Sequence, residues 1–210
     1  MKSRLAWFCF ALCLCGIALP AIPQSNPPLR KVYFAAGQPT APVRIEVFSD
    51  YQCSACRTFY TATLSRLLND AETENRVSVV YHDFPLQMHP YAREASRYAL
   101  AARRLGKKQW AALTEAFYSR QDQWSADGKV GRIAEEVLSP QDYARVKDLA
   151  QDPSIEQEIT EGLELGHRLQ VNATPTFFIV SNGRAQRVVG GVPYQVLDSY
   201  IQNMSKQQSH

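Results

Sequence analysis

The sequence is poor in cysteine, and its few cysteines are unevenly placed. There are five among 210 residues, and three of them, Cys9, Cys13 and Cys15, lie close to the N-terminus. The rest of the chain holds only Cys53 and Cys56. A small secreted domain held together by disulfides carries more cysteines than one pair. A disulfide framework is therefore excluded, and the remaining pair is expected to be reactive rather than structural.

The chain also has no hydrophobic run long enough for an ordinary transmembrane helix. The uncharged run from Leu5 to Leu19 spans about 15 residues, whereas roughly 20 are needed to cross the hydrocarbon core. A short basic region precedes this run, and the small residues Gly16, Ala18 and Ala21 lie at or just after its end, which is the layout of a secretory signal peptide. We expect residues 1–21 to be a signal peptide cleaved after Ala18 or Ala21, with a retained anchor as the alternative. Export would place the protein in the periplasm or another extracytoplasmic compartment.

Neither sign of charge is in large excess. The chain has 23 Lys and Arg residues against 20 Asp and Glu, and loss of Lys2 and Arg4 with the signal leaves 21 basic side chains. No stripe of Lys and Arg with interleaved aromatic residues is present. Proteins that bind nucleic acids usually carry such a basic patch. The composition therefore predicts no nucleic-acid partner.

Metal ligands are scarce as well. A zinc site would need two ligands besides the cysteine pair. The histidines available for that purpose are His82, His89, His167 and His210. We interpret the first two as a residue at a strand end and a residue at a helix entry. No metal and no other cofactor are expected.

Short apolar runs and long helical patterns follow one another along the rest of the chain. Runs rich in β-branched and aromatic residues predict strands at 43–48, 77–81, 176–180 and 186–189, and helical spacing predicts helices at 57–68 and 193–204. The pattern between 91 and 170 is helical almost throughout. Breaks divide this stretch into four or five helices, at Gly106, Asp127-Gly128, Ser139-Pro140 and Asp152-Pro153.

These elements predict an α/β fold with a mixed sheet. The first two strands are joined by a helix, so they should be parallel with a right-handed crossover. Asn182-Gly183 favours a type I′ turn and hence a hairpin near the C-terminus. Residues 43–204 then form one domain, with a helical insertion at about 91–170 between the second and third core strands. Residues 22–42 are interpreted as a linker with a short edge strand at 32–34, and 205–210 as a frayed tail.

The cysteine pair stands where a strand gives way to a helix. A thiolate at a helix N-terminus is stabilised by free backbone N–H groups and by the helix dipole. Cys53 is one turn earlier and should be more exposed, so we expect it to attack or to leave in disulfide exchange, while Cys56 resolves the mixed disulfide. Stabilising the Cys53 thiolate also makes the disulfide more oxidising. A structural disulfide or half of a metal site are the alternatives.

A proline stands directly before the third predicted core strand. Proline rarely lies inside a β ladder, so Pro175 marks a strand start, an edge or a cis turn. Only about one X-Pro bond in twenty is cis in folded proteins. The residues alone therefore leave a cis bond as the minority interpretation.

Three motifs in this order resemble the DsbA-like branch of the thioredoxin superfamily. They are the run from Ile45 to Cys56, then Asp83-Phe84-Pro85-Leu86 with His89-Pro90, and finally the run from Ala173 to Phe177. The resemblance covers most of the mature chain and implies a thioredoxin-like fold with a helical insertion. The chain departs from the pattern at Ser54-Ala55, where the best-known oxidases carry Pro-His. Because that dipeptide helps to set the redox potential, the direction of the reaction stays open.

The resemblance also implies roles for residues outside the pair. Pro175 would be cis and lie opposite Cys53, and the Thr174 backbone would pair with an extended substrate segment by strand addition. Glu46 could relay protons to Cys56, as a buried acid does in the family. The alternative for Glu46 is a residue near a strand end that reaches water.

These observations predict an exported thiol:disulfide oxidoreductase that passes its disulfide to unfolded or reduced exported proteins and is reoxidised by a membrane redox partner. A reductase or isomerase would use the same pair in the other direction. A binding protein is the alternative from another class, either a peptide-binding chaperone or a copper-handling domain. Copper favours thiolate and thioether ligands, and Met88 and Met204, the only methionines after Met1, are far from the pair in sequence.

Overall fold

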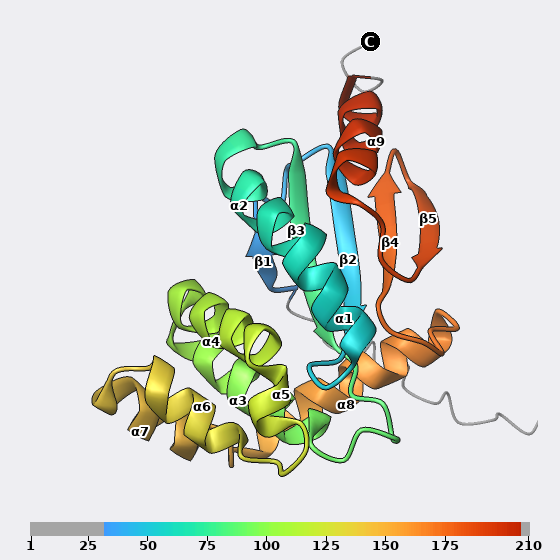
Figure 1. The fold of residues 1–210 in the computed structure, drawn as a ribbon. Coiled ribbons are helices and arrows are strands. Elements are labelled where there is room, and N and C mark those ends of the chain that lie inside the picture. The colour runs from blue at the N-terminus through green and yellow to red at the C-terminus, as the bar shows by residue number, and fades with distance from the viewer. Residues whose placement is uncertain (1–31, 207–210) are drawn as a thin grey trace, which may run out of the picture. The chain divides into compact units, whose positions relative to one another are not determined.

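The computed structural model describes residues 32–206, apart from the side chains of residues 72–74. Five strands form one sheet in the order β1-β3-β2-β4-β5 (Figure 1). They are β1 (Phe34–Ala36), β2 (Val43–Ser49), β3 (Val77–Asp83), β4 (Thr176–Ser181) and β5 (Arg184–Val189). β2 and β3 are parallel, and the other neighbours are antiparallel. The predicted mixed sheet and the parallel first pair are confirmed.

A long helical segment connects β2 to β3 across one face of the sheet. It consists of α1 (Ser54–Phe59), a π-helical turn η1 (Tyr60–Leu64) and α2 (Ser65–Glu74). The helix predicted at 57–68 is thus part of a longer element that begins directly after Cys53. The C-terminal helix α9 (Tyr194–Lys206) packs against α2 and η1 on the same face (Figure 1).

The insertion between β3 and β4 is helical over most of residues 92–168, as predicted. Its helices are α3 (Ala92–Leu105), α4 (Lys107–Ser119), α5 (Gln121–Trp124), α6 (Val130–Val137), α7 (Pro140–Leu149) and α8 (Pro153–Arg168). The expectation of four or five helices is wrong because α5 is a single turn, too short to show a period. The predicted breaks are right: Ser139 and Asp152 cap α7 and α8 through their side-chain oxygens, each followed by proline.

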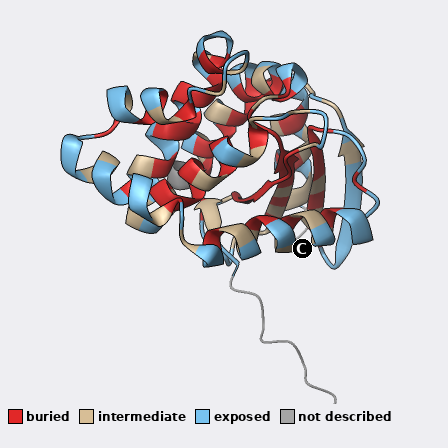
Figure 2. Ribbon diagram, turned by 90° about the horizontal axis from the view of Figure 1, so that it is seen from below, coloured by how far each residue is buried: buried red, intermediate tan, exposed pale blue. Residues whose placement is uncertain are grey.

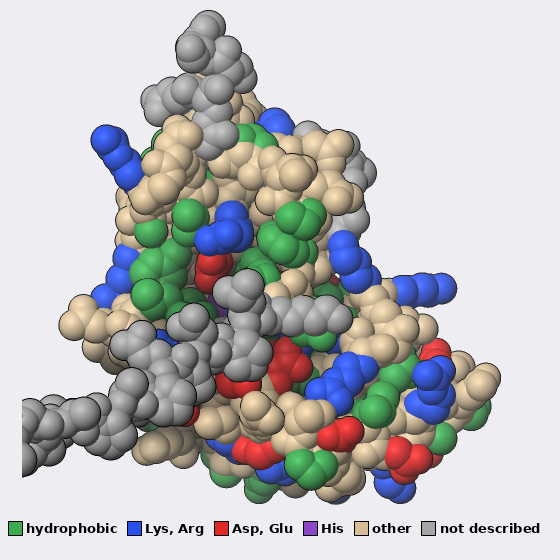
Figure 3. Space-filling view, turned by 180° about the vertical axis from the view of Figure 1, so that it is seen from behind, with side chains coloured by type: hydrophobic (Ala, Val, Ile, Leu, Met, Phe, Trp, Pro, Cys, Tyr) green, Lys and Arg blue, Asp and Glu red, His purple; other side chains and the backbone are tan. Residues whose placement is uncertain are grey.

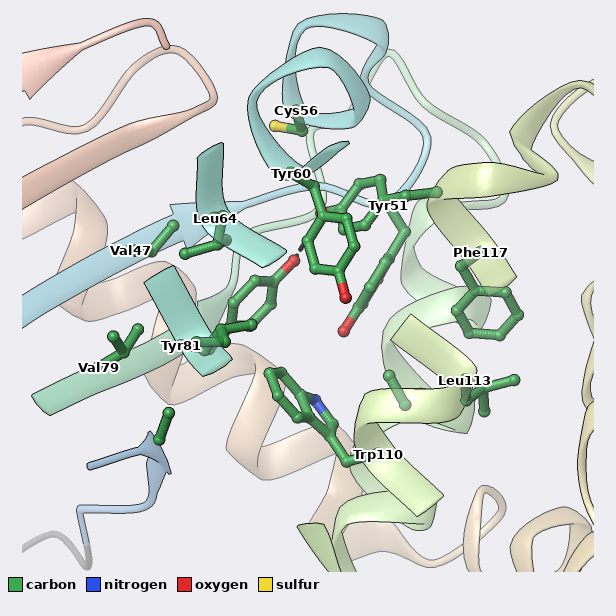
Figure 4. Packing of buried hydrophobic residues seen from close by; sticks show 14 of the residues in the cluster. Val47, Tyr51, Cys56, Tyr60, Leu64, Val79, Tyr81, Trp110, Leu113 and Phe117 are labelled. Atoms are coloured by element: carbon green, nitrogen blue, oxygen red, sulfur yellow. Dashed lines mark hydrogen bonds between the residues drawn. The ribbon is translucent and has the colours of Figure 1, made fainter. Parts of the chain in front are cut away.

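The sheet and the insertion share one hydrophobic core. Side chains from β2 and β3, such as Val47 and Tyr81, lie in the same cluster as Trp110 and Leu113 of α4 (Figure 4). Buried positions are concentrated on the strands and on the inner faces of the helices (Figure 2). Burying this apolar surface is the main favourable term in folding. The insertion is therefore part of the domain's core and not a separate globule.

The hairpin of β4 and β5 turns as the sequence predicts. Asn182 and Gly183 have φ values of 51° and 69°. A type I′ turn requires positive φ at both central residues, and Asn and Gly tolerate it. β5 is the outer strand and its side chains are largely exposed.

Two predictions at the ends of the domain need correction. The edge strand lies at 34–36 and not at 32–34, because Val32 and Tyr33 are exposed and only Phe34 and Ala36 pair with β3. The C-terminal helix continues to Lys206, so the tail was predicted to begin two residues too early. The predicted signal peptide at 1–21, the first part of the linker at 22–31 and residues 207–210 lie outside the described residues.

Acidic and basic side chains lie next to one another over the helical part of the face shown in Figure 3. On α3 and α8, for example, Arg93 and Arg97 both bind the carboxylate of Glu156. Each such exposed pair contributes little, typically about 0–1 kcal/mol. In residues 32–206, no helix is both long and apolar enough for a membrane span.

Candidate functional site

The two cysteines lie at the start of α1, above the carboxyl end of β2. Cys53 is the N-cap residue, with extended backbone dihedrals, and Cys56 lies in the first turn. Both are free thiols. Cys53 is 9% exposed and Cys56 is completely buried, which is the order of exposure that the sequence predicts.

The surroundings of Cys53 favour its thiolate. A hydrogen bond from the Cys56 side chain is the largest of the causes that lower the Cys53 pKa from 9.0 to about 5. Burial opposes this effect, while the Thr174 hydroxyl and the backbone N–H groups of Cys56 and Ala55 add to it. These N–H groups are among those that a helix N-terminus leaves without an intrahelical partner. The position at the helix start thus has the electrostatic effect expected from the sequence.

The surroundings of Cys56 have the opposite effect. Burial raises the pKa of Cys56 well above its ordinary value, and the neighbouring Cys53 raises it further. Hydrogen bonds from Ser49 and Thr174 act against that rise. The backbone N–H of Asp50 also donates to Cys56 Sγ at 3.5 Å. The pair is therefore asymmetric: Cys53 is the acidic and slightly more exposed thiol, and the Cys56 thiol beneath it holds its proton.

The loop before β4 meets the cysteine pair. The Thr174–Pro175 peptide bond is cis, which is the arrangement that the resemblance implies. The Cys53 thiol donates to the Thr174 carbonyl oxygen at 3.5 Å, across 121 positions of sequence. Thr174 and Pro175 are both buried. The structure thus brings together four of the five predicted site residues.

Glu46 is the residue that the structure does not bring to the pair. Along β2, Val47 points to the side covered by α1, whereas Glu46 points to the opposite side of the sheet, as strand alternation requires. There its carboxylate binds Arg44 Nε at 3.0 Å and His82 Nε2 at 3.1 Å. A relay from Glu46 to Cys56 would have to cross the sheet. The geometry does not support the relay hypothesis, and Glu46 does not lie at a strand end either.

The turn that carries Cys53 is held by side chains to which the sequence assigned no role. The buried Asp50 carboxylate accepts hydrogen bonds from the backbone N–H groups of Gln52 and Leu86, at 2.7 and 2.8 Å, and pairs with His89 Nδ1 at 2.7 Å. The Gln121 amide donates to the carbonyl oxygens of Tyr51 and Cys53, at 2.7 and 3.1 Å. Asp50 and His89 belong to the motifs that carry the family resemblance, which was the available signal for them. Nothing in the sequence marked Gln121.

A largely apolar groove lies beside the cysteine helix. It has a volume of about 600 Å³ and lies between α1 with η1 and the loop that leads into α9. Ala55, Thr58 and Phe59 line one side of it, and Val192 and Pro193 line the other. Over residues 32–206, no three His, Cys, Asp or Glu side chains are grouped so that they could hold a metal ion.

The sequence model of the family described as Thioredoxin matches residues 31–188, which is most of the chain. The chain belongs to the thioredoxin family. One relative is the "Probable disulfide bond formation protein D" of Bacillus cereus, 22% identical over 153 residues that cover 70% of this chain and 69% of the relative. Its counterpart in Bacillus anthracis is 22% identical over the same length.

Solved structures of this family have the same fold. The alpha-DsbA1 protein of Wolbachia pipientis superposes with a TM-score of 0.71 at 18% identity, covering 86% of this chain and 94% of that one. BdbD from Bacillus subtilis, in its oxidised form, gives a TM-score of 0.65 at 17% identity, covering 81% and 91%. The predicted thioredoxin-like fold is confirmed, and the DsbA-like resemblance is supported by these matches. The names of the two Bacillus relatives, disulfide bond formation proteins, agree with the predicted thiol:disulfide oxidoreductase.

Proposed function

We propose that this protein is exported and oxidises cysteine pairs in other exported proteins through a redox disulfide between Cys53 and Cys56. A substrate thiolate attacks Cys53 Sγ and Cys56 leaves as a thiolate, giving a mixed disulfide. A second substrate thiolate then attacks the substrate sulfur of that bond, and Cys53 leaves. The substrate is oxidised by two electrons, and the reduced pair returns to the disulfide by exchange with a membrane redox partner.

The observation that carries the proposal is the position of Cys53 at the start of α1, where the Cys56 thiol and free backbone N–H groups lower its pKa. A thiol with a pKa of about 5 is almost entirely thiolate at neutral pH. Because the thiolate exists only in the reduced protein, its stabilisation favours the reduced form and makes the disulfide a stronger oxidant. The acidity of Cys53 thus supports oxidation of substrates over their reduction.

The surroundings of Cys53 support a protein substrate. Thr174 and Pro175 lie directly beside Cys53 in the loop that leads into β4, where an extended segment could add by backbone hydrogen bonds. The apolar groove beside α1 could accept a side chain of that segment. Such contacts depend little on substrate sequence, which suits an enzyme that acts on many unfolded proteins.

The test is disulfide transfer to a reduced, unfolded protein that has two cysteines. The oxidised protein should oxidise the substrate stoichiometrically, and Cys53→Ser should abolish transfer. Cys56→Ser, which has no disulfide to transfer, should instead form a stable mixed disulfide when its Cys53 thiolate attacks the oxidised, disulfide-bonded form of the same substrate, detectable by mass spectrometry. If wild type transferred no disulfide, or if Cys53→Ser behaved as wild type, the proposal would be refuted.

The equilibrium reduction potential of the pair tests the direction. An oxidase requires a value well above about −270 mV, the potential of thioredoxin. A value at or below it would indicate a reductase that uses the same residues. Fractionation of cells that produce the full chain tests export, since a protein that stayed in the cytoplasm would contradict the proposed compartment.

A further inference from the structure

A chain of buried hydroxyl groups begins beneath the cysteine pair. Ser49 Oγ and the Tyr118 hydroxyl are 2.8 Å apart, and the hydroxyls of Tyr118 and Tyr81 are 2.6 Å apart. The three residues come from β2, α4 and β3, and each is at most 3% exposed. Figure 4 shows Tyr81 in the same buried cluster as Cys56.

Such a chain costs free energy to bury, since each hydroxyl loses its hydrogen bonds to water. Phenylalanine in place of either tyrosine would fill the same space without that cost. The hydroxyl groups are hydrogen-bonded to one another. These hydrogen bonds alone do not explain why the hydroxyl groups lie at the end of β2, next to the turn that leads to Cys56. The chain of hydroxyl groups is therefore a candidate for a role in the exchange reaction.

Ser49 connects the hydroxyl chain to Cys56. It precedes Asp50, whose N–H donates to Cys56 Sγ at 3.5 Å. A hydrogen bond from the Ser49 side chain lowers the pKa of Cys56, and the charge on Cys56 in turn raises the pKa of Tyr118. The sulfur is thus close enough to both residues for the charge of one group to alter the other.

Among the causes that shift the pKa of Cys56, the charged group is the Cys53 thiolate, which raises that pKa. The groups that influence its titration are Cys53 in α1, Ser49 in β2 and Thr174 before β4. Glu46, the acid that the sequence offered for this purpose, lies on the other side of the sheet. Stabilisation of a Cys56 thiolate has to come from neutral donors.

We propose that Ser49 and Tyr118 are positioning residues for Cys56: Ser49 donates a hydrogen bond to the Cys56 thiolate, and Tyr118, held by Tyr81, donates to Ser49 and keeps its hydroxyl aimed at the sulfur. This inference rests on the proposed role of Cys56 in exchange. Hydrogen bonds to a charged group are stronger than those to a neutral one. The chain of hydroxyl groups therefore favours the step in which Cys56 becomes charged.

That step can be written in either direction. When Cys56 resolves a mixed disulfide, its thiol loses a proton to water, the Cys56–Cys53 bond forms, and the Cys53–substrate bond breaks to release a substrate thiolate. When the disulfide is donated, the same bonds change in reverse and Cys56 leaves as a thiolate. Ser49 stabilises the charged sulfur in both directions, because the forward and reverse reactions share one transition state.

The test separates the Cys53 step from the Cys56 step. Reduced protein is mixed with glutathione disulfide, quenched with acid at short times, and analysed by mass spectrometry. The glutathione adduct appears at the rate of attack by Cys53 and decays at the rate of attack by Cys56. Adduct decay is measured from pH 5 to pH 10 for wild type, Ser49→Ala and Tyr118→Phe.

We expect Ser49→Ala to slow adduct decay about tenfold at pH 7, as loss of a hydrogen bond to a charged group implies. The midpoint of the pH dependence of adduct decay should shift to higher pH for the same reason. Tyr118→Phe should cause a smaller slowing in the same direction. Because Tyr118 acts through Ser49, it should have no further effect in the Ser49→Ala background. Adduct formation should change less than twofold in every variant.

Tyr60→Phe is the matched control. Tyr60 stacks on the Tyr118 ring at 4.7 Å between centroids, but its hydroxyl bonds to Glu115. It should leave adduct decay at the wild-type rate, and thermal unfolding of each variant checks that it is folded. If folded Ser49→Ala and Tyr118→Phe resolved the adduct like wild type at every pH, the inference would be wrong while the proposed function stood. If wild type formed no Cys53–Cys56 disulfide, the proposed function would fail first.

Discussion

The acidity of Cys53 depends most on Cys56, so removal of the Cys56 thiol is the sharpest perturbation of the site. The hydrogen bond from Cys56 is the largest cause of the low Cys53 pKa, which is about 5 in the intact pair. A hydrogen bond to a charged group contributes about 1.5–3 kcal/mol. At about 1.4 kcal/mol for each pH unit, its loss should raise the pKa by roughly one to two units.

Cys56→Ala should therefore move the titration of Cys53 to between about pH 6 and pH 7. The rate of iodoacetamide alkylation follows the thiolate, and absorbance at 240 nm gives an independent titration. Cys56→Ser keeps a hydroxyl donor at the same position, so its midpoint should lie between those of Cys56→Ala and wild type. A wild-type midpoint near pH 8.5, or the same midpoint in wild type and Cys56→Ala, would refute the reasoning.

The same shift has a consequence for stability. The Cys53 pKa is lower in the folded, reduced protein than in the unfolded chain. Its contribution to stability is therefore present above the unfolded value of 9.0 and is lost as the pH falls through about 5. The disulfide form has no such contribution. The reduced protein should thus gain stability relative to the oxidised protein as the pH rises from 5 to 9, which paired thermal unfolding curves would measure.

Four further substitutions test other parts of the structure. Burial raises the pKa of Asp83 from 3.8 to about 7, so the contribution of its protonated carboxyl to stability is present below pH 3.8 and is lost as the pH rises through 7. In urea unfolding, the free energy of unfolding of the wild type should therefore fall by about 3 kcal/mol between pH 4.5 and 7.5. Asp83→Asn should not show this fall. Gly166→Ala should cost about 1–3 kcal/mol, because its Cβ would overlap the Phe84 ring, whereas Gly183→Ala, with no atom within 4 Å, should show only the cost of its positive φ. Asp50→Ala leaves the Leu86 N–H without its partner, and should both destabilise the protein and change the alkylation rate of Cys53.

Most of the sheet could be predicted from the sequence because its signals are local. Strands β2, β3 and β4 are short runs of β-branched and aromatic residues, and the hairpin turn is fixed by Asn182 and Gly183. The position of Cys53 at a helix start follows from a strand directly before a helical period. Each of these features needs only its own neighbours in sequence. The greater exposure of Cys53 than of Cys56 could be predicted for the same reason.

The surroundings of the pair were harder to predict because they depend on the fold. Strand alternation puts Glu46 and Val47 on opposite faces, but the sequence does not say which face the cysteine helix will cover. Gln121 reaches the Cys53 turn from a helix almost 70 positions later in the chain. Such contacts depend on how α4 and α5 pack on the sheet. No local sequence pattern predicts that packing.

The helical insertion supplies groups that the sheet and α1 lack. Without Gln121 the buried Tyr51 carbonyl oxygen would lose its 2.7 Å partner, and an unpaired buried acceptor costs about 1–3 kcal/mol. Without Tyr118 the Ser49 hydroxyl would lose its 2.8 Å partner beneath Cys56. Both cysteines thus depend on side chains that lie between β3 and β4 in sequence. The insertion therefore helps to hold the cysteine pair in place, in addition to covering the sheet.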